Sequence, residues 1–250
     1  MSAQPLLDVR GLTKVFGGFA AVSEVDLAVR PGTIHSVIGP NGAGKTTLFR
    51  LLTGTHRPTS GTIRFDGRDM GGALPHAVSR RGLAQSFQIT NVFPRLTVHE
   101  SVQVAVLARH RRTWNLVSAR QDTVSAEATE LLSEVGLAAV ADAQARTLSH
   151  GDQRILEVAL ALATRPRLLL LDEPTAGMSP AETGRMVSLV TGLAEARGLT
   201  VVLSEHDMDI VFGISDEVTV MHRGSVISRG TPAEVQQDPQ VAEVYLGGEQ

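Results

Sequence analysis

The fold follows from one short segment, Gly39-Pro40-Asn41-Gly42-Ala43-Gly44-Lys45-Thr46, which satisfies the pattern G-x-x-x-x-G-K-[ST]. Glycines in such a loop let backbone N–H groups turn toward phosphate oxygens, and the helix that follows adds its positive end. Lys45 is placed to reach the β and γ phosphates of a nucleotide, and we expect its side chain to be exposed. The Thr46 hydroxyl can bind Mg²⁺, and Thr47 is expected to help hold the same nucleotide.

The neighbouring sequence separates a phosphate loop from a chance glycine-rich turn. An apolar strand, Thr33–Gly39, runs into the segment, and a helix with apolar positions at Leu48, Leu51 and Leu52 follows it. A strand, a glycine loop and a helix in this order are the context that the motif requires. The sequence therefore predicts a nucleotide-binding site.

A second segment, Leu168-Leu169-Leu170-Leu171-Asp172-Glu173-Pro174, ends a buried strand in two adjacent carboxylates. Alone, it would be explained by an ordinary strand that ends in a polar turn. Beside a phosphate loop, Asp172 is expected to hold Mg²⁺, and Glu173 can accept a proton from an attacking water.

The rest of the chain alternates strands with helices, which favours an α/β core. Alternating apolar residues predict an antiparallel β edge over Leu6–Thr13 and Val22–Val29. From about residue 91 to about residue 165 helical patterns dominate, so we expect an inserted all-helical subdomain there. The single domain of residues 1–250 then has a core of about residues 1–90 and 166–250.

Composition excludes several classes of protein. The chain has 250 residues and a formal net charge of −3, from 23 basic and 26 acidic residues, which argues against nucleic-acid binding. It contains no cysteine, so disulfides and thiolate chemistry are excluded. The histidines lack ligand spacing, and we assign no zinc. Neither a signal peptide nor an apolar run long enough to span a membrane is found, so we expect a cytoplasmic location.

These motifs resemble those of the ATP-binding subunits of ABC transporters. Leu148-Ser149-His150-Gly151-Asp152-Gln153-Arg154 resembles the signature motif of that family, Gln88 its Q-loop, and His206 its switch histidine. Phe16 stands where the family stacks an aromatic ring on adenine. The resemblance runs from about Val9 to Gly230 and implies a P-loop NTPase core of the ABC ATPase type.

The resemblance implies how such a subunit works. Two subunits, as a homodimer or as a heterodimer with a second ABC ATPase subunit, pair head to tail around two ATP molecules. Ser149 and the N–H of Gly151 then reach the γ-phosphate on the other subunit. Glu173 is implied as the catalytic base, with His206 and Gln88 beside it, and Thr46, Gln88 and Asp172 as the Mg²⁺ ligands.

Three positions depart from the commoner family pattern. His150 stands in place of Gly, Asp152 in place of Gln, and Ser179 in place of Asp at the end of the loop after Glu173. His150 is either a titrating group near the phosphate or a surface variant with no role in pH dependence. The contacts that Ser179 makes are left open.

A narrower resemblance points to uptake systems for hydrophobic, or branched-chain, amino acids. It rests on Phe87-Gln88-Ile89-Thr90-Asn91-Val92-Phe93-Pro94-Arg95-Leu96-Thr97-Val98, on Ala176-Gly177-Met178-Ser179-Pro180 and on Tyr245-Leu246-Gly247. Related systems carry urea or amides. The implied partners are transmembrane permease subunits and, indirectly, a periplasmic solute-binding protein, with the chain on the inner face of the cell membrane.

Two other functions share these motifs. One is a soluble ABC ATPase that acts on ribosomes or DNA, and the other is the ATPase of a lipid or polysaccharide exporter. The helical insertion also contains a basic and aromatic cluster, which has three interpretations: a solvated helix end, a contact with a membrane subunit, or nucleic-acid binding. Its members are Arg109, His110, Arg111, Arg112 and Trp114. His35, on the strand before the phosphate loop, is expected to be packed in the core.

Gln88 is expected at the junction between the core and the helical insertion. The apolar residues Val92 and Phe93 follow it, and Pro94 stiffens the segment. These residues either form a docking groove for a helix of a membrane subunit or pack into the core of the insertion itself.

Overall fold

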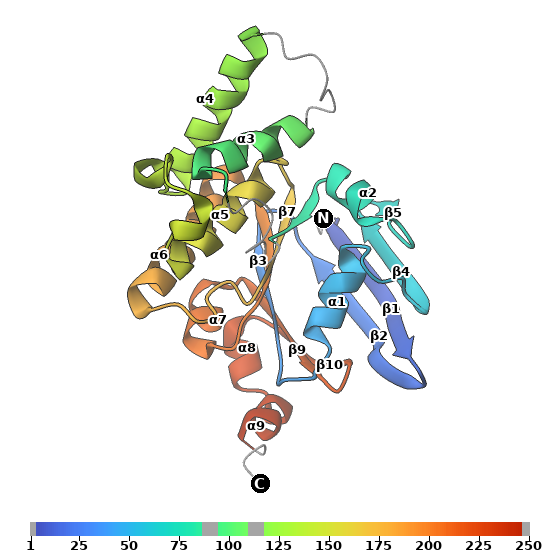
Figure 1. Cartoon of the computed structure of the whole chain (residues 1–250). Coiled ribbons are helices and arrows are strands. Elements are labelled where there is room, and N and C mark those ends of the chain that lie inside the picture. The colour runs from blue at the N-terminus through green and yellow to red at the C-terminus, as the bar shows by residue number, and fades with distance from the viewer. Residues whose placement is uncertain (1–3, 87–94, 110–117, 247–250) are drawn as a thin grey trace.

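The computed structural model describes residues 4–86, 95–109 and 118–246. They form an α/β structure in which two sheets lie side by side and a group of helices covers the far face of the larger sheet (Figure 1). Within the described ranges, no helix has the length and apolar character needed to cross a bilayer. The α/β core with an antiparallel edge, predicted from the sequence, is confirmed.

The larger sheet has six strands in the order β10-β9-β3-β8-β7-β6. Five of them run parallel, and β10 pairs antiparallel with β9 at one edge. Their bounds are β3 Ile34–Ile38, β6 Leu83–Gln85, β7 Leu168–Asp172, β8 Thr200–Ser204, β9 Glu217–His222 and β10 Ser225–Gly230. Because β3, β7 and β8 are parallel neighbours, the residues that follow them meet at one edge of the sheet.

The smaller sheet is antiparallel, in the order β2-β1-β4-β5. Its bounds are β1 Leu7–Phe16, β2 Phe19–Val29, β4 Ser60–Phe65 and β5 Arg68–Asp69. Strand β1 continues three residues beyond the predicted end, to a turn of two glycines at positive φ, Gly17 and Gly18. A turn at Asp66-Gly67 joins β4 to β5.

Most helices lie around the larger sheet. Their bounds are α1 Lys45–Leu52, α2 Pro75–Arg80, α3 Val98–Arg109, α4 Ser118–Glu134, α5 His150–Leu162, α6 Pro180–Arg197, α7 Met208–Ile214, α8 Pro232–Gln236 and α9 Pro239–Leu246. Two 3₁₀ turns, Ala138–Val140 and Ala145–Thr147, lie between α4 and α5. Helices α3, α4 and α5 pack together at the upper end of the molecule in Figure 1. The domain boundaries given above stay a prediction.

Alternation of side chains along the buried strands builds two separate cores. Along β7, Leu169 and Leu171 face the helices α5 and α6, whereas Leu168 and Leu170 face α1 and the smaller sheet. All four leucines are fully buried. A strand that is apolar on both faces is typical of a parallel sheet covered on both sides, and here the smaller sheet supplies one of the covers.

Three short elements were not predicted: β6, α2 and α7. Strand β6 has three residues and α2 six, which is too short for a hydrophobic period to be visible. Helix α7 begins after Asp207, whose side chain accepts hydrogen bonds from the N–H groups of Asp209 and Ile210. That cap was the available signal for α7.

Candidate functional site

The phosphate loop joins β3 to α1, and the surrounding backbone leaves no room for a side chain at two of its glycines. A Cβ atom on Gly39 would lie 2.1 Å from the carbonyl oxygen of Met221, and one on Gly44 would lie 2.5 Å from that of Ala21. Gly42 has φ 80° with nothing within 4 Å, so its constraint is conformational alone. The loop is therefore held between the two sheets, with β9 on one side and β2 on the other.

Lys45 is the first residue of α1, and its side chain curls back over the loop. Its Nζ donates to the carbonyl oxygens of Gly39 at 2.6 Å and Pro40 at 3.3 Å. The prediction of an exposed lysine is wrong, because only 6% of the residue is accessible. Burial lowers the pKa of Lys45, while the charges of Glu173 and Asp172 act in the opposite direction. An anion bound next to Lys45 would therefore stabilise the charged form of its side chain.

The two predicted carboxylates stand at the end of β7, beside β8. Asp172 accepts a hydrogen bond of 2.6 Å from the hydroxyl of Ser204. Glu173 has φ 50°, and its N–H donates to the carbonyl oxygen of Ser204 at 3.0 Å. A non-glycine residue at positive φ costs roughly 1–3 kcal/mol, which is typical of a functional site.

The structure brings Glu173 and His206 together, as the sequence predicted for a shared site. The Nε2 atom of His206 lies 2.7 Å from Oε1 of Glu173, and the two side chains are 45% and 40% exposed. A base that is exposed to solvent and oriented by a histidine can accept a proton from water. Gln88, Val92 and Phe93 lie outside the described residues.

Two residues that fix this pair were missed by the sequence analysis. Ser204 holds both Asp172 and the backbone of Glu173. Glu205 is 4% exposed and accepts hydrogen bonds from Thr175 N–H at 2.9 Å and from its hydroxyl at 2.7 Å. The signal was their position, since Ser204 ends the apolar strand β8 and Glu205 follows it, directly before His206.

Phe16 lies at the end of β1 and is 43% exposed. Its ring meets His56 edge-to-face at 5.4 Å, and Lys14 Nζ lies 4.9 Å from its centroid. The β1–β2 turn lies at the same end of the molecule as the start of α1 (Figure 1). An aromatic face with a neighbouring cation is suited to stacking on a base.

Tyr245, on α9, packs against the core cluster that contains Ile38, directly before the phosphate loop. Burial raises the pKa of Tyr245 to about 12, and the nearby backbone of Gly39 acts in the opposite direction. Helix α9 lies at the lower end of the molecule in Figure 1, where β3 ends. Tyr245 therefore lies near the end of the strand that leads into the phosphate loop.

The signature segment opens α5, away from the phosphate loop of its own chain. Ser149 is the N-cap and accepts a hydrogen bond from Asp152 N–H at 3.1 Å. The N–H of Gly151 donates to Oε1 of Glu182 at 3.1 Å. Residues 39–46 and 148–154, all of them described, share no hydrogen bond or ion pair. Within one chain, the structure thus separates the phosphate loop from the signature segment. The resemblance expects these two parts around one phosphate only when they come from two different subunits.

The predictions for His35 and for the basic and aromatic cluster have different outcomes. His35 is fully buried, as expected, and its Nε2 lies 2.8 Å from the hydroxyl of Thr219. Arg109 is not a solvated helix end, because it donates to both carboxylate oxygens of Glu127 and to the carbonyl oxygen of Ala163. The other members of that basic and aromatic cluster lie outside the described residues.

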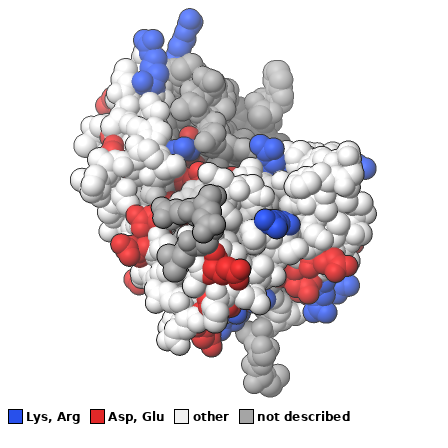
Figure 2. Space-filling model, turned by 90° about the horizontal axis from the view of Figure 1, so that it is seen from below, with Lys and Arg blue, Asp and Glu red and all other residues white. Residues whose placement is uncertain are grey.

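The face of the molecule seen from below is mixed in charge. On the face that Figure 2 shows, acidic side chains form small groups and basic side chains are scattered among uncharged residues. Over the described atoms in that view, no continuous basic surface forms.

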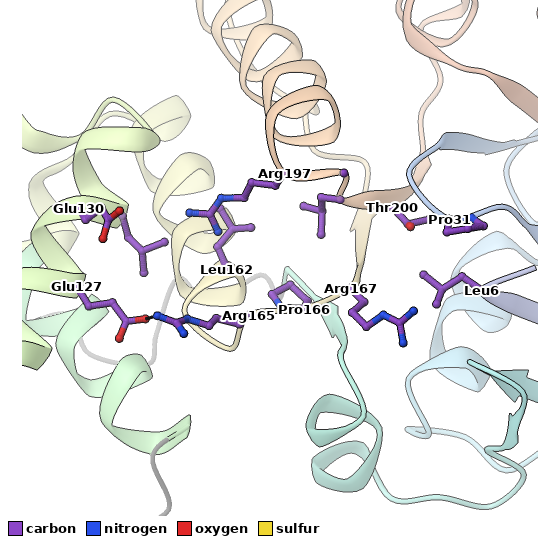
Figure 3. A pocket seen from close by; sticks show the side chains of 13 residues that line it. Leu6, Pro31, Glu127, Glu130, Leu162, Arg165, Pro166, Arg167, Arg197 and Thr200 are labelled. Atoms are coloured by element: carbon purple, nitrogen blue, oxygen red, sulfur yellow. Dashed lines mark ion pairs between the residues drawn. The ribbon is translucent and has the colours of Figure 1, made fainter.

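A hollow of about 570 Å³ lies at the other edge of the larger sheet, where β7 and β8 begin. Figure 3 shows that three arginines line it, Arg165, Arg167 and Arg197. Each forms an ion pair, with Glu127, Asp66 and Glu134 respectively. This hollow holds none of the predicted site residues.

An apolar groove of about 480 Å³ lies between α2, β6, α3 and α5. Its walls include Val104 and Ala108 of α3, Leu160 of α5, and Val78 of α2. Gln85, two residues before the segment outside the described residues, also lines it. The groove therefore lies between one edge of the larger sheet, at β6, and the helices α2, α3 and α5.

Comparisons with known proteins agree with this geometry. The family described as "ABC transporter" matches residues 22–176, and "Branched-chain amino acid ATP-binding cassette transporter" matches residues 225–250. The chain is 42% identical over 253 residues to the high-affinity branched-chain amino acid transport ATP-binding protein BraF of Pseudomonas aeruginosa, covering 98% of this chain and 99% of that protein. It is 39% identical to LivG of Escherichia coli, which carries the same description, with the same coverage.

Among solved structures, the fold is similar to the ADP conformation of an ATP-binding cassette of an ABC transporter. The TM-score is 0.88 at 28% sequence identity, over 98% of this chain and all of that one.

Proposed function

Because the chain belongs to the ABC transporter family and is an ATPase of that type, we propose that it powers the import of branched-chain amino acids. The observation that carries the proposal is the meeting of Lys45, Asp172, Glu173 and His206 at one edge of the parallel sheet. The full-length similarity to BraF and LivG supports the choice of substrate.

ATP binds with its phosphates in the loop between β3 and α1. Lys45 exchanges its contacts with two carbonyl groups for the β and γ phosphates, which offsets the cost of its burial. The N–H groups of the loop and of Thr46 and Thr47, at the start of α1, bind the same oxygens. Phe16 stacks on the adenine.

The donor set near the loop fits Mg²⁺. Asp172 and Thr46 offer a carboxylate and a hydroxyl oxygen, which are the hard ligands that this ion prefers, and the resemblance adds Gln88. The described residues contain no group of three or more acidic, His or Cys side chains suited to a metal. That agrees with an ion held by one or two protein oxygens together with phosphates. Bound Mg²⁺ would neutralise charge that develops on the phosphates.

Glu173 acts as the base in hydrolysis. The oxygen of a water molecule attacks the γ-phosphorus, the bond to the bridging oxygen breaks, and ADP leaves. The proton of the water passes to Glu173, whose Oε1 is kept in place by His206. Ser204 and Glu205 hold the surrounding backbone.

A second cassette subunit completes each site. Ser149 and Gly151 make no hydrogen bond with the phosphate loop of their own chain, so we assign them to the nucleotide of a partner. That nucleotide would take over the N–H of Gly151, which donates to Glu182 here. Whether that partner is a second copy or a different ABC ATPase subunit, the pairing is head to tail.

The groove beside Gln85 receives a helix of a transmembrane permease subunit. Most of its exposed surface is apolar, and one of its lining residues is Gln85, which precedes Gln88 closely in the sequence. The chain thereby associates with the cytoplasmic face of the membrane, and a periplasmic solute-binding protein acts through the permease.

Reconstitution tests the proposal. The chain is assembled with its permease subunits and its partner cassette in vesicles with ATP inside, the solute-binding protein is added outside, and uptake of labelled leucine, isoleucine and valine is measured. ATP-dependent uptake is expected, and Lys45→Ala should abolish it because the loop loses its cation. ATP hydrolysis without uptake of any of the three amino acids would refute the substrate but not the ATPase.

A further inference from the structure

Three contacts join the first turn of α5 to the segment after Glu173. His150 Nε2 lies 3.2 Å from the carbonyl oxygen of Ala176, and Gly151 N–H donates to Oε1 of Glu182 at 3.1 Å. Arg185 donates to Oδ1 of Asp152 at 3.0 Å. We call these contacts, together with Ser179, the α5–α6 clamp. All three positions that depart from the commoner family pattern belong to it.

Glu182 is the centre of the clamp. Its Oε2 accepts hydrogen bonds from Ser179 N–H at 3.0 Å and from the Ser179 hydroxyl at 2.8 Å, while its Oε1 faces Gly151. One carboxylate therefore caps the N-termini of both α5 and α6. Hydrogen bonds from Ser179, first from its backbone and then from its side chain, together with that from Gly151, lower the pKa of Glu182 to about 2.

Gly151 allows the carboxylate of Glu182 to approach the backbone of α5. A Cβ atom on Gly151 would lie 2.6 Å from Oε1 of Glu182, so that side chain would have to move. Gly177 is constrained by its φ of 75°, because a Cβ atom there would make only an ordinary contact of 3.4 Å with Nε2 of His150.

The same segment is tied to the catalytic pair at its other end. Thr175 donates twice to Glu205, and Glu205 Oε2 lies 3.3 Å from the N–H of His206. Hydrogen bonds therefore join Gly151 to Glu182, Glu182 to Ser179, and Thr175 to Glu205, and the covalent backbone of residues 175–179 connects them. The path ends at the backbone N–H of His206.

We propose that Glu182 is a positioning residue that couples the two ATP sites of the dimer. When the signature turn docks on the nucleotide of the partner, the α5–α6 clamp transmits that movement to Glu173 and His206 of its own chain. The proposal rests on the proposed function, since it requires hydrolysis by a pair of cassettes. Asp152 and Arg185 support Glu182 from the surface.

Glu182→Gln tests the coupling because it keeps the shape of the side chain and removes its charge. In the purified full-length chain with Mg²⁺ and ATP, we expect kcat to fall about tenfold or more and the Hill coefficient for ATP to fall toward one. The dissociation constant for ATP, measured by calorimetry on the isolated chain, should stay within about twofold, because the clamp does not touch the phosphate loop. Glu195→Gln, an exposed carboxylate on the same helix, is the matched control and should change neither quantity.

An exchange of charges gives a second test that does not depend on Glu182. Asp152→Arg and Arg185→Asp should each reduce kcat and the Hill coefficient, and the double variant should recover both. Recovery requires the pair to act through its contact, so failure of the double variant to recover overturns that part of the clamp.

The outcomes separate the coupling from the catalytic assignment. If Glu173→Gln abolishes hydrolysis while Glu182→Gln keeps the kcat and Hill coefficient of the unchanged chain, the coupling is wrong and the proposed chemistry stands. If Glu173→Gln also hydrolyses ATP normally, the proposed function fails first. A fall in melting temperature and in ATP affinity together for Glu182→Gln would assign it a purely structural role and overturn the proposal.

Discussion

The 2.7 Å contact between Glu173 and His206 makes one substitution decisive. Glu173→Gln keeps the size of the side chain and removes the proton acceptor, so hydrolysis should fall by about two or more orders of magnitude. ATP binding should survive, because Lys45 and the loop are unchanged. Single-turnover hydrolysis and equilibrium binding of ATP check the two halves separately. Hydrolysis at the normal rate would show that Glu173 is not the base.

His35 makes the stability of the protein depend on pH. Burial lowers the pKa of His35 from 6.5 to about 4, with Glu217 acting against that shift and Arg229 and Arg30 adding to it. The unfolded chain then binds more protons between these values, so the contribution is complete above pH 6.5 and is lost as the pH falls toward 4. Between pH 7 and pH 5 the unfolding free energy should fall by about 2 kcal/mol through this group.

Urea unfolding at the two pH values measures that loss. His35→Gln removes the titrating ring, so its stability should change less with pH than that of the unchanged chain. His76→Gln, at an exposed position on α2, is the matched control and should show the pH dependence of the unchanged chain. Equal pH dependence in His35→Gln would contradict the assignment.

Close packing between strands and loops limits which residues the phosphate loop can contain. Gly39→Ala places a methyl group 2.1 Å from the carbonyl oxygen of Met221, so β9 or the loop must move. We expect about 3 kcal/mol or more of destabilisation and loss of ATP binding. Gly42→Ala meets no atom within 4 Å and should cost about 1 kcal/mol through its φ alone. Thermal unfolding of both variants provides the comparison, and equal melting temperatures would refute the close packing at Gly39.

Local patterns in the sequence were enough to predict the buried strands and the phosphate loop. Four consecutive leucines before Asp172 require a strand covered on both faces, and a glycine loop before Lys45 requires a strand and a helix. The short elements β6 and α2 could not be predicted, because tertiary pairing with β7 and packing against the core define them. Ser204 and Glu205 were missed for a similar reason, since their roles come from contacts 30 or more residues away in sequence.

The same limit explains the errors on charged residues. Lys45 was expected to be exposed, because its two carbonyl partners cannot be inferred from spacing. Arg109 was grouped with a basic cluster, although in the structure it pairs with Glu127 on another helix. In both cases the partner of a charge decides its burial, and that partner is a product of the fold.

For the complete transporter, the groove between α2, β6, α3 and α5 predicts how the subunit attaches. Val104 lines it and is 37% exposed, so Val104→Arg should leave the melting temperature and ATP affinity of the isolated chain unchanged. Assembly with the permease subunits should be lost, because an arginine cannot be buried unpaired in an apolar groove. Co-purification measures this, with Gln103→Arg on the same helix as the control. Normal assembly of Val104→Arg would exclude the groove as the docking site.

The position of β3 in its sheet has a consequence for synthesis on the ribosome. Its neighbours in the sheet are β8 and β9. Synthesis of β3 ends at Ile38, but β8, the first of its two partners, is complete only when Ser204 has been added to the chain. At roughly 5–20 residues per second, that delay is about ten to thirty seconds. During this time an apolar strand with unpaired backbone groups is open to aggregation. The nascent chain should therefore depend on a chaperone, and it should acquire affinity for ATP only when its last quarter emerges.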